Sequence, residues 1–153
     1  AGVAWARRSK KEKGVVWVFL SDGECQEGQT WEALMAMAFH KISNIKIVVD
    51  VNGQQVDGRT DDVMNLEPLL KKFSSFGACA KQVDGHNIKA LRKAFETSHE
   101  DRPLVVLAKT LPYKGMEILK LRYPHLHYVR FKNESERNDF KQHLNLMESK
   151  RKK

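Results

Sequence analysis

The sequence predicts an α/β fold in which helices cover both faces of a parallel sheet. Short apolar runs rich in β-branched residues alternate along the chain with segments of helical spacing. Such runs are typical of strands that are buried on both faces of a parallel sheet. Strand, helix and strand in succession form a βαβ unit, whose parallel strands end at the same edge of the sheet. Because open α/β sheets bind ligands at that edge, we expect the functional residues to follow the strands.

Each expected element is a segment of uniform character. The expected strands are 15–20, 45–49, 78–83 and 103–108. The expected helices are 1–12, 29–42, 66–76, 87–98 and 133–147. Polar or irregular composition predicts loops at 53–62 and 109–130. We expect one domain, 1–153, with 109–130 as a long active-site loop and 148–153 as a basic tail.

Helix boundaries follow from residues that favour caps. Gly14 and Gly77 are expected just past two helix ends, where glycine adopts left-handed backbone angles. Asn65 and Asn87 are expected to cap the helices that follow them.

The helix at 29–42 shows apolar residues at spacings of three and four, which predicts a buried stripe. This stripe consists of Trp31, Leu34, Met35, Ala38 and Phe39. We expect His40, at the end of the same segment, to pack in the core.

Composition excludes several classes of protein. The net charge of +8 comes from residues 7–13 and 141–153, without interleaved aromatic residues, so a specific nucleic-acid role is not expected. No apolar run approaches the roughly 20 residues of a membrane helix, so no membrane role is expected. The start of the chain lacks the charge order of a signal peptide, and Cys25 and Cys79 lack disulfide or metal spacing. We therefore expect a cytoplasmic protein with Cys79 in its core.

Polar residues follow all four expected strands. Asp22 and Asn52 follow the first two strands, thirty residues apart, and His86 and Thr110 follow the other two. All four should therefore line one edge of the sheet. A carboxylate, an amide and a backbone carbonyl form a modest oxygen site that suits Mg²⁺ when a diphosphate supplies further oxygens. Asp and Asn are also common turn and cap residues, which is the structural alternative.

A longer segment carries a family resemblance. SDGECQEGQTWEALMAMAFHKISNIKIVVDVNGQQVDG resembles the thiamine-diphosphate-binding segment of transketolases, whose motif begins Gly-Asp-Gly and ends in Asn about thirty residues on. The similarity continues through TDDVMNLEPLLKKFSSFGACAKQVDGHNIKALRKAF and weakens after Thr110. It is greatest to the amino-terminal chain of split, two-subunit transketolases.

The resemblance implies thiamine diphosphate and Mg²⁺ as cofactors. It implies Asp22, Asn52 and the backbone carbonyl of Gln54 as metal ligands. Gly23, with Glu24 behind it, should let backbone N–H groups approach the phosphates, because a side chain at Gly23 would block them. The remaining residues expected at the cofactor are Ser21, which stands where the family has glycine, Val56 and His86.

Two further residues receive roles in catalysis from the resemblance. Glu27 matches a glutamate that couples the two active sites across the subunit interface, although it also suits a first helical turn. His127, within Leu126-His127-Tyr128, matches loosely a loop histidine near the diphosphate and substrate. His125 is the alternative, and His86 suits a turn as well as a pocket.

The implied function is transfer of a two-carbon ketol unit between sugar phosphates, as in the pentose phosphate pathway. The glutamate that activates the cofactor comes in this family from a pyrimidine-binding chain, so we expect such a partner in an oligomer. The chain starts within a helix, which predicts a domain truncated at its N-terminus and inactive by itself. The alternatives are another thiamine-diphosphate enzyme, of the deoxyxylulose-phosphate synthase or 2-oxo acid dehydrogenase type, and a catalytically silent fragment with a binding or assembly role.

Overall fold

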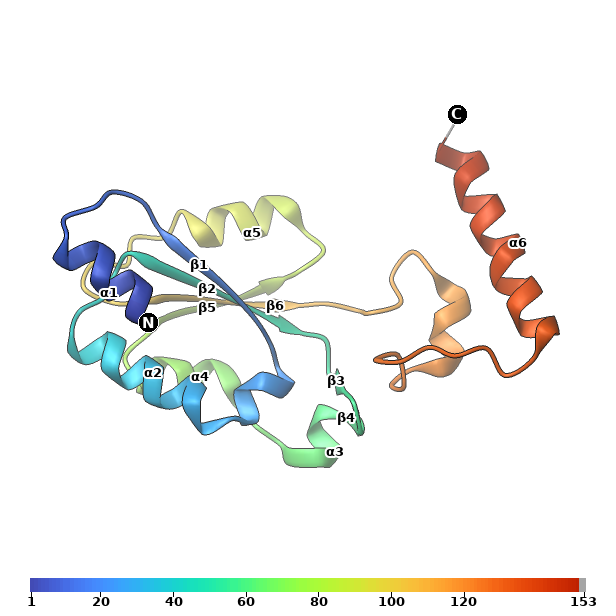
Figure 1. The fold of residues 1–153 in the computed structure, drawn as a ribbon, viewed down its shortest axis with the longest axis horizontal. Coiled ribbons are helices and arrows are strands. Elements are labelled where there is room, and N and C mark those ends of the chain that lie inside the picture. The colour runs from blue at the N-terminus through green and yellow to red at the C-terminus, as the bar shows by residue number, and fades with distance from the viewer. Residues whose placement is uncertain (152–153) are drawn as a thin grey trace.

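The computed structural model describes residues 1–151 and contains a four-stranded parallel sheet in the order β1-β2-β6-β5 (Figure 1). The sheet strands are β1 (Val16–Ser21), β2 (Ile45–Val51), β5 (Cys79–Asp84) and β6 (Leu104–Lys109). A small antiparallel hairpin pairs β3 (Gln54–Gln55) with β4 (Gly58–Arg59). The α-helices are α1 (Gly2–Ser9), α2 (Gly28–Phe39), α3 (Thr60–Met64), α4 (Leu69–Ser75), α5 (Ile88–Phe95) and α6 (Glu134–Arg151). Two 3₁₀ helices are η1 (Gly23–Gln26) and η2 (Glu117–Arg122).

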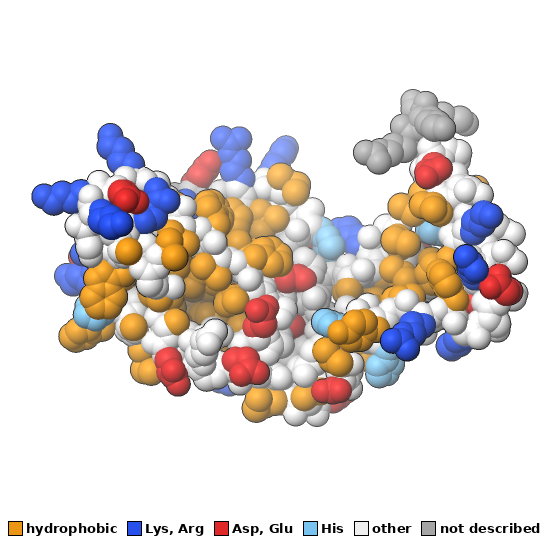
Figure 2. All heavy atoms as spheres, in the orientation of Figure 1, with side chains coloured by type: hydrophobic (Ala, Val, Ile, Leu, Met, Phe, Trp, Pro, Cys, Tyr) orange, Lys and Arg blue, Asp and Glu red, His pale blue; other side chains and the backbone are white. Residues whose placement is uncertain are grey.

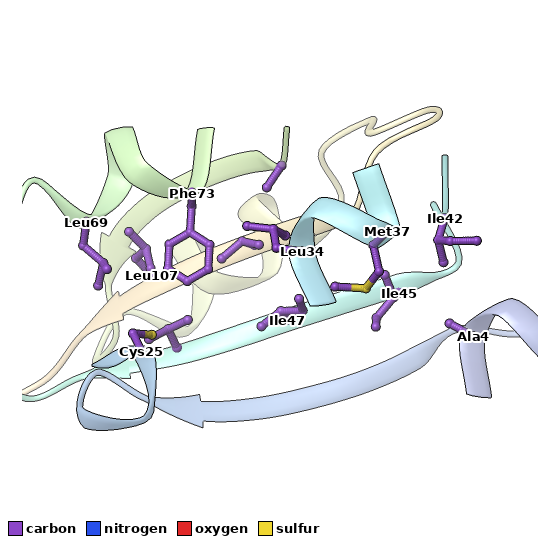
Figure 3. Close-up of a cluster of buried hydrophobic side chains, with 13 residues drawn as sticks. Ala4, Cys25, Leu34, Met37, Ile42, Ile45, Ile47, Leu69, Phe73 and Leu107 are labelled. Carbon is purple, nitrogen blue, oxygen red and sulfur yellow. The ribbon is translucent and has the colours of Figure 1, made fainter. Parts of the chain in front are cut away.

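The helices form a layer on each face of the sheet, as the sequence predicts. In Figure 1, α2 and α4 lie below the sheet and α5 lies above it. The lower layer contains the larger core, in which Leu34 of α2 and Phe73 of α4 pack against Ile47 of β2 (Figure 3). The upper core is smaller and joins Ala94 of α5 to Val106 of β6.

Strand β6 lies inside the sheet, and its residues 104–108 are all buried. Strand β1 lies at one edge, where Trp17 is 55% and Phe19 is 72% exposed on the face that carries α5. Trp17 contacts Phe95 of α5, at 5.0 Å between ring centroids. The α5 layer therefore leaves the β1 side of this face open.

Two helix ends differ from the predicted ones because lysines, rather than glycines, adopt the left-handed backbone. Helix α1 ends before Lys11 (φ 56), and the predicted stop at Gly14 is wrong. Helix α2 ends before Lys41 (φ 53) in the same way. Gly77 (φ 91) does follow α4 as predicted, and a Cβ there would lie 2.6 Å from Cβ of Ala38.

The predicted stripe on α2 is only partly correct. Leu34 is buried and Trp31 packs against the same core, but Met35 is 51% and Phe39 is 82% exposed. The segment is apolar nearly all the way round, so its spacing does not single out one face. His40 is half-buried against Trp5, at 4.0 Å between ring centroids, and the prediction of a core histidine is wrong.

Two other boundaries differ because of local turn chemistry. The segment 53–62, predicted to be a loop, forms the β3–β4 hairpin and the start of α3. Helix α4 begins only after Pro68, since a residue before proline disfavours helical angles. Asn65 does not cap α4 and instead accepts a hydrogen bond from the N–H of Glu67 at 2.7 Å. Asn87 caps α5 as predicted, accepting from the N–H of Ala90 at 3.0 Å.

The C-terminal segment stands beside the sheet body (Figure 1). The predicted loop 109–130 contains η2, which is tied to α6 by the ion pair of Arg122 with Glu136. Helix α6 continues through Arg151, so the expected basic tail 148–153 is helical as far as it is described, and 152–153 lie outside the described residues. Cys25 and Cys79 are free and buried. Among the described helices, none combines the length and apolar character needed to cross a bilayer.

We expect Phe73→Ala to lower the free energy of unfolding by about 3 to 5 kcal/mol, because it opens a cavity in the larger core. The side chain of Phe73 is fully buried and its ring lies 5.0 Å from that of Trp31. Urea unfolding followed by circular dichroism measures the loss. The matched control is Phe39→Ala on exposed α2 surface, which should change stability by less than about 0.5 kcal/mol. Equal losses in both variants would contradict this assignment of the core.

Candidate functional site

The carboxyl ends of the four strands meet at a cavity of about 470 Å³. Asp22, Asn52, His86 and Thr110 all line this cavity, so the predicted convergence of these four residues on one edge is confirmed. The strand register explains it, because Ser21 pairs with Asp50 and Asp84 pairs with Lys109 at the strand ends.

Asp22 connects the loops that follow β1 and β2. Its Oδ1 accepts a hydrogen bond from the N–H of Gly23 at 2.9 Å, and its Oδ2 accepts one from the N–H of Gly53 at 2.8 Å. The side chain is only 4% exposed. The Asp22 carboxylate therefore holds the loops after β1 and β2 together.

Burial raises the pKa of the Asp22 carboxyl above its ordinary value of 3.8, although the backbone N–H groups of Gly53 and Gly23 and the hydroxyl of Thr60 oppose this shift. The nearby charge of Asp50 also raises the pKa. Burial therefore makes the ionised form of Asp22 less stable, and a bound cation would stabilise that form.

Asn52 has both ends of its amide engaged. Its Oδ1 accepts from the N–H of Gln54 at 3.0 Å, and its Nδ2 donates to Oδ2 of Asp50 at 2.8 Å. A carbonyl oxygen has a second lone pair, so Oδ1 can still serve as a cation ligand.

Ser21 and Glu24 form a reciprocal capping box around η1. The Glu24 carboxylate accepts from the Ser21 N–H at 2.7 Å, and Ser21 Oγ accepts from the Glu24 N–H at 3.2 Å. Ser21 is not among the residues with positive φ, so serine occupies this family glycine position without backbone strain. The N–H groups of Gly23 and Glu24, expected to face phosphates, are both engaged within the loop.

The remaining candidates line a second hollow of about 500 Å³ next to the first. Asn52 lines both hollows. The predicted residues in the second hollow are Ser21, Gly23, Glu24, Glu27, Asn52, Gln54, Val56 and His127. Every candidate site residue of the sequence except the alternative histidine, His125, therefore lines one of two neighbouring hollows.

The two catalytic candidates share the second hollow. Glu27 is exposed at the position before α2 and its side chain makes no capping hydrogen bond there. His127 is exposed and stacks edge-on against Tyr128, at 4.8 Å between ring centroids. The alternative, His125, lies near Gly58 of the hairpin and lines neither hollow.

His86 is fixed against the loop after β6. Its Nε2 accepts from the N–H of Leu111 at 2.7 Å, which assigns the ring proton of the neutral form to Nδ1. The preceding Gly85 is closely packed, since a Cβ there would lie 2.5 Å from Cγ2 of Thr110. His86 is thus both a turn residue and a lining residue, two interpretations that the sequence left open.

Sequence reasoning missed several charged residues of the first cavity. Its lining includes four carboxylates, from Asp22, Asp61, Glu67 and Asp84, against Lys109 and Lys114. Figure 2 shows acidic side chains on the side of the body toward the C-terminal segment and Lys and Arg around α1 at the far end. Asp84 and Lys109 end their strands, so the same strand-end rule could have found them. Tyr123, beside Gly53, had no such signal.

The donor set suits a cation that brings its own ligands. Within residues 1–151 no three His, Cys, Asp or Glu side chains converge on a metal position. Instead, the Asp22 carboxylate and the Asn52 amide line the same cavity, a set that Mg²⁺ accepts when phosphates supply further oxygens. Buried Oε1 atoms of Gln54 and Gln55 have no hydrogen-bond partner in the described part of the chain, and both residues line the second hollow. Gly23 keeps this hollow open, because its Cβ would lie 3.3 Å from Gln55.

Fold and site together define an α/β protein with two hollows at the carboxyl edge of a parallel sheet, the edge where sheets of this kind bind ligands. Residues 8–120 match the family described as transketolase, thiamine diphosphate binding domain. The chain belongs to the transketolase family, within its amino-terminal, thiamine-diphosphate-binding domain.

Relatives include proteins named as transketolase subunits. The chain is 38% identical over 124 residues to an uncharacterized transketolase family protein of Sinorhizobium fredii, covering 79% of this chain and 44% of that protein. It is 32% identical over 128 residues to an apulose-4-phosphate transketolase subunit of Actinobacillus succinogenes, covering 83% and 46%. A 6-deoxy-6-sulfo-D-fructose transketolase subunit of a Clostridium species is 32% identical, covering 74% and 42%. The chain thus spans less than half the length of these relatives.

Solved structures agree on the fold. The transketolase of Campylobacter jejuni superposes with a TM-score of 0.59 at 25% identity, over 70% of this chain and 17% of that one. A transketolase variant of Pichia stipitis gives a TM-score of 0.63 at 22% identity, over 71% and 18%. The predicted fold class is confirmed.

We expect Asp22 to make the metal-free protein less stable as pH rises. Its folded-state pKa is raised, so the folded protein binds more protons than the unfolded chain above about pH 3.8, and stability falls through that range. Asp22→Asn removes this titration. In urea unfolding between pH 4 and pH 7, the stability of Asp22→Asn relative to wild type should therefore increase with pH. A constant difference across that range would contradict the raised pKa.

Proposed function

We propose that this chain is the diphosphate- and magnesium-binding part of a transketolase-like enzyme that transfers a two-carbon ketol unit between sugar phosphates. One observation carries the proposal: the buried Asp22 carboxylate joins the loops after β1 and β2 and lines the same cavity as Asn52. This is the position at which a parallel α/β sheet binds its ligand.

In this proposal the cation is held by Asp22, Asn52 and the backbone carbonyl of Gln54. The cavity carries more carboxylates than lysines, which supports a divalent cation. Three protein oxygens leave room for phosphate oxygens in an octahedral shell. The site is therefore expected to bind Mg²⁺ weakly by itself and strongly together with a diphosphate.

The cofactor would extend from the first cavity into the second. Ser21, Gly23, Glu24 and Val56 line the second hollow, and His86 lines the first, so we assign these residues to cofactor binding. Lys109 and Lys114 are cations in the first cavity that suit the phosphate of a sugar substrate.

Thiamine diphosphate, when bound, supplies the carbanion chemistry that ketol transfer requires. This chain's residues would orient the cofactor, with His127 facing the second hollow and Glu27 contacting a second protomer. The names of the related transketolase subunits support a pyrimidine-binding partner chain. The exposed Trp17 and Phe19 support an oligomer, and two free cysteines suit a reducing, cytoplasmic setting.

One observation favours a second candidate, a silent remnant with a binding or assembly role. The N–H groups of Gly23 and Glu24 are engaged inside their own loop, so phosphate binding must displace those hydrogen bonds. Another thiamine-diphosphate enzyme would differ in its sugar or oxo-acid substrate while using the same cation site. Binding of thiamine diphosphate would distinguish the proposed enzyme from a silent remnant. Substrate assays would distinguish it from another thiamine-diphosphate enzyme.

We expect the chain to bind thiamine diphosphate only in the presence of Mg²⁺, and Asp22→Asn to lose this binding by at least about tenfold, since the substitution removes the only anionic ligand. Isothermal titration calorimetry with and without Mg²⁺ measures it. Asp62→Asn is the matched control, because Asp62 is an exposed carboxylate on α3, paired with Arg59, that lines neither hollow. No heat of binding in wild type would favour the silent remnant.

We further expect no ketol transfer by the isolated chain, even with thiamine diphosphate, Mg²⁺, a ketose phosphate donor and an aldose acceptor. A cofactor held only at its diphosphate end lacks the orientation that catalysis needs. A coupled assay of ketol transfer, run before and after adding a pyrimidine-binding chain, measures whether activity requires this partner. Turnover by the isolated chain, absent in Asp22→Asn, would contradict the need for a partner.

A further inference from the structure

We propose that Asp50 is the positioning residue of the cation site: its carboxylate selects which end of the Asn52 amide faces the cation and fixes the loops around it. The inference rests on the proposed Mg²⁺ and diphosphate function. It assigns a role to a residue that neither lines the two hollows nor serves as a proposed ligand.

Asp50 contacts all three loops that build the site. Its Oδ2 accepts from Nδ2 of Asn52 at 2.8 Å, and its Oδ1 accepts from the hydroxyl of Thr110. Its backbone carbonyl accepts from the N–H of Asp22 at 3.1 Å. The strand register makes this reach possible, because Asp50 on β2 lies between Ser21 of β1 and Ala108 of β6.

The chemistry of the pair determines the orientation of Asn52. An ionised carboxylate only accepts hydrogen bonds, whereas an amide has one end that donates and one that accepts. Asp50 therefore binds the nitrogen end, and Oδ1 points away from it, where it accepts from the N–H of Gln54. A flipped Asn52 would place its oxygen against a carboxylate oxygen and its NH₂ against the Gln54 N–H, which loses both hydrogen bonds. The oxygen end is thus fixed before any cation arrives.

Both carboxylate oxygens of Asp50 accept hydrogen bonds from side chains, which suits a residue that acts through Asn52 rather than as a ligand. The bond to Thr110 fixes the carboxylate itself and links it to the loop after β6. Thr110 is held in turn by its N–H, which donates to the carbonyl of Val51 at 3.1 Å. Loss of the Thr110 hydroxyl should therefore weaken cation binding in the same direction as loss of the Asp50 charge, and by less.

The test measures Mg²⁺ affinity at saturating thiamine diphosphate by calorimetry in the full chain. Asp50→Asn should weaken Mg²⁺ binding by about 10- to 100-fold, the range for partners that orient metal ligands. Thr110→Val should weaken it several-fold, and Thr110→Ser, which restores the hydroxyl, should recover most of the loss. Asp62→Asn controls for the loss of one negative charge and should match wild type.

A second measurement needs no ligand. In ¹H–¹⁵N spectra of the metal-free protein, the side-chain amide of Asn52 should shift in Asp50→Asn and less in Thr110→Val, while the dispersed backbone signals show that both variants are folded. Folded Asp50→Asn with wild-type Mg²⁺ affinity would overturn the inference and leave the proposed function intact. Failure of wild type to bind thiamine diphosphate with Mg²⁺ would overturn both.

Discussion

The hydrogen bonds of one buried carboxylate hold the loops at the carboxyl edge of the sheet together. Asp22 follows edge strand β1, and its bond to the N–H of Gly53 fixes the loop after β2. Gly53 has φ of +72°, and its position against Tyr123 links the same loop to the C-terminal segment. The hairpin starts at Gln54, directly after Gly53, so this bond holds the hairpin near the end of β1. Burial disfavours the negative charge of Asp22, and a cation bound beside this carboxylate would reduce that unfavourable free energy.

Much of this arrangement follows from the sequence because topology alone brings strand ends together. The expected strands agree with the observed ones within one or two residues, and their parallel pairing placed Asp22, Asn52, His86 and Thr110 on one cavity. No side-chain contact had to be known for that step. The family resemblance then supplied the residues of the second hollow, since spacing gave no reason to choose Val56 or His127.

The features that the sequence did not predict depend on tertiary side-chain contacts or on which residue adopts the left-handed backbone at a helix end. The surroundings of Asp22 include Gly53 and Thr60, on either side of the hairpin, and a short polar segment such as 53–62 gives no periodic signal that would place them. Lys11 and Lys41 end helices in left-handed conformations where glycine is the usual choice. Helix α2 is apolar around most of its surface, so only packing against Phe73 and Ile47 determines which side is buried.

The capping box between Ser21 and Glu24 has a thermodynamic consequence for any anion that enters the second hollow. The loop is already ordered, so a ligand would not have to supply the conformational entropy of fixing it. The same order means that the loop's N–H groups already have partners, at 2.9 Å for Gly23 and 3.2 Å for Glu24. Binding through these groups would exchange internal hydrogen bonds for external ones, with little net gain in enthalpy. Affinity at this loop would then come mainly from charge neutralisation at the neighbouring cation, and ionic strength, rather than hydrogen-bond geometry, would govern it.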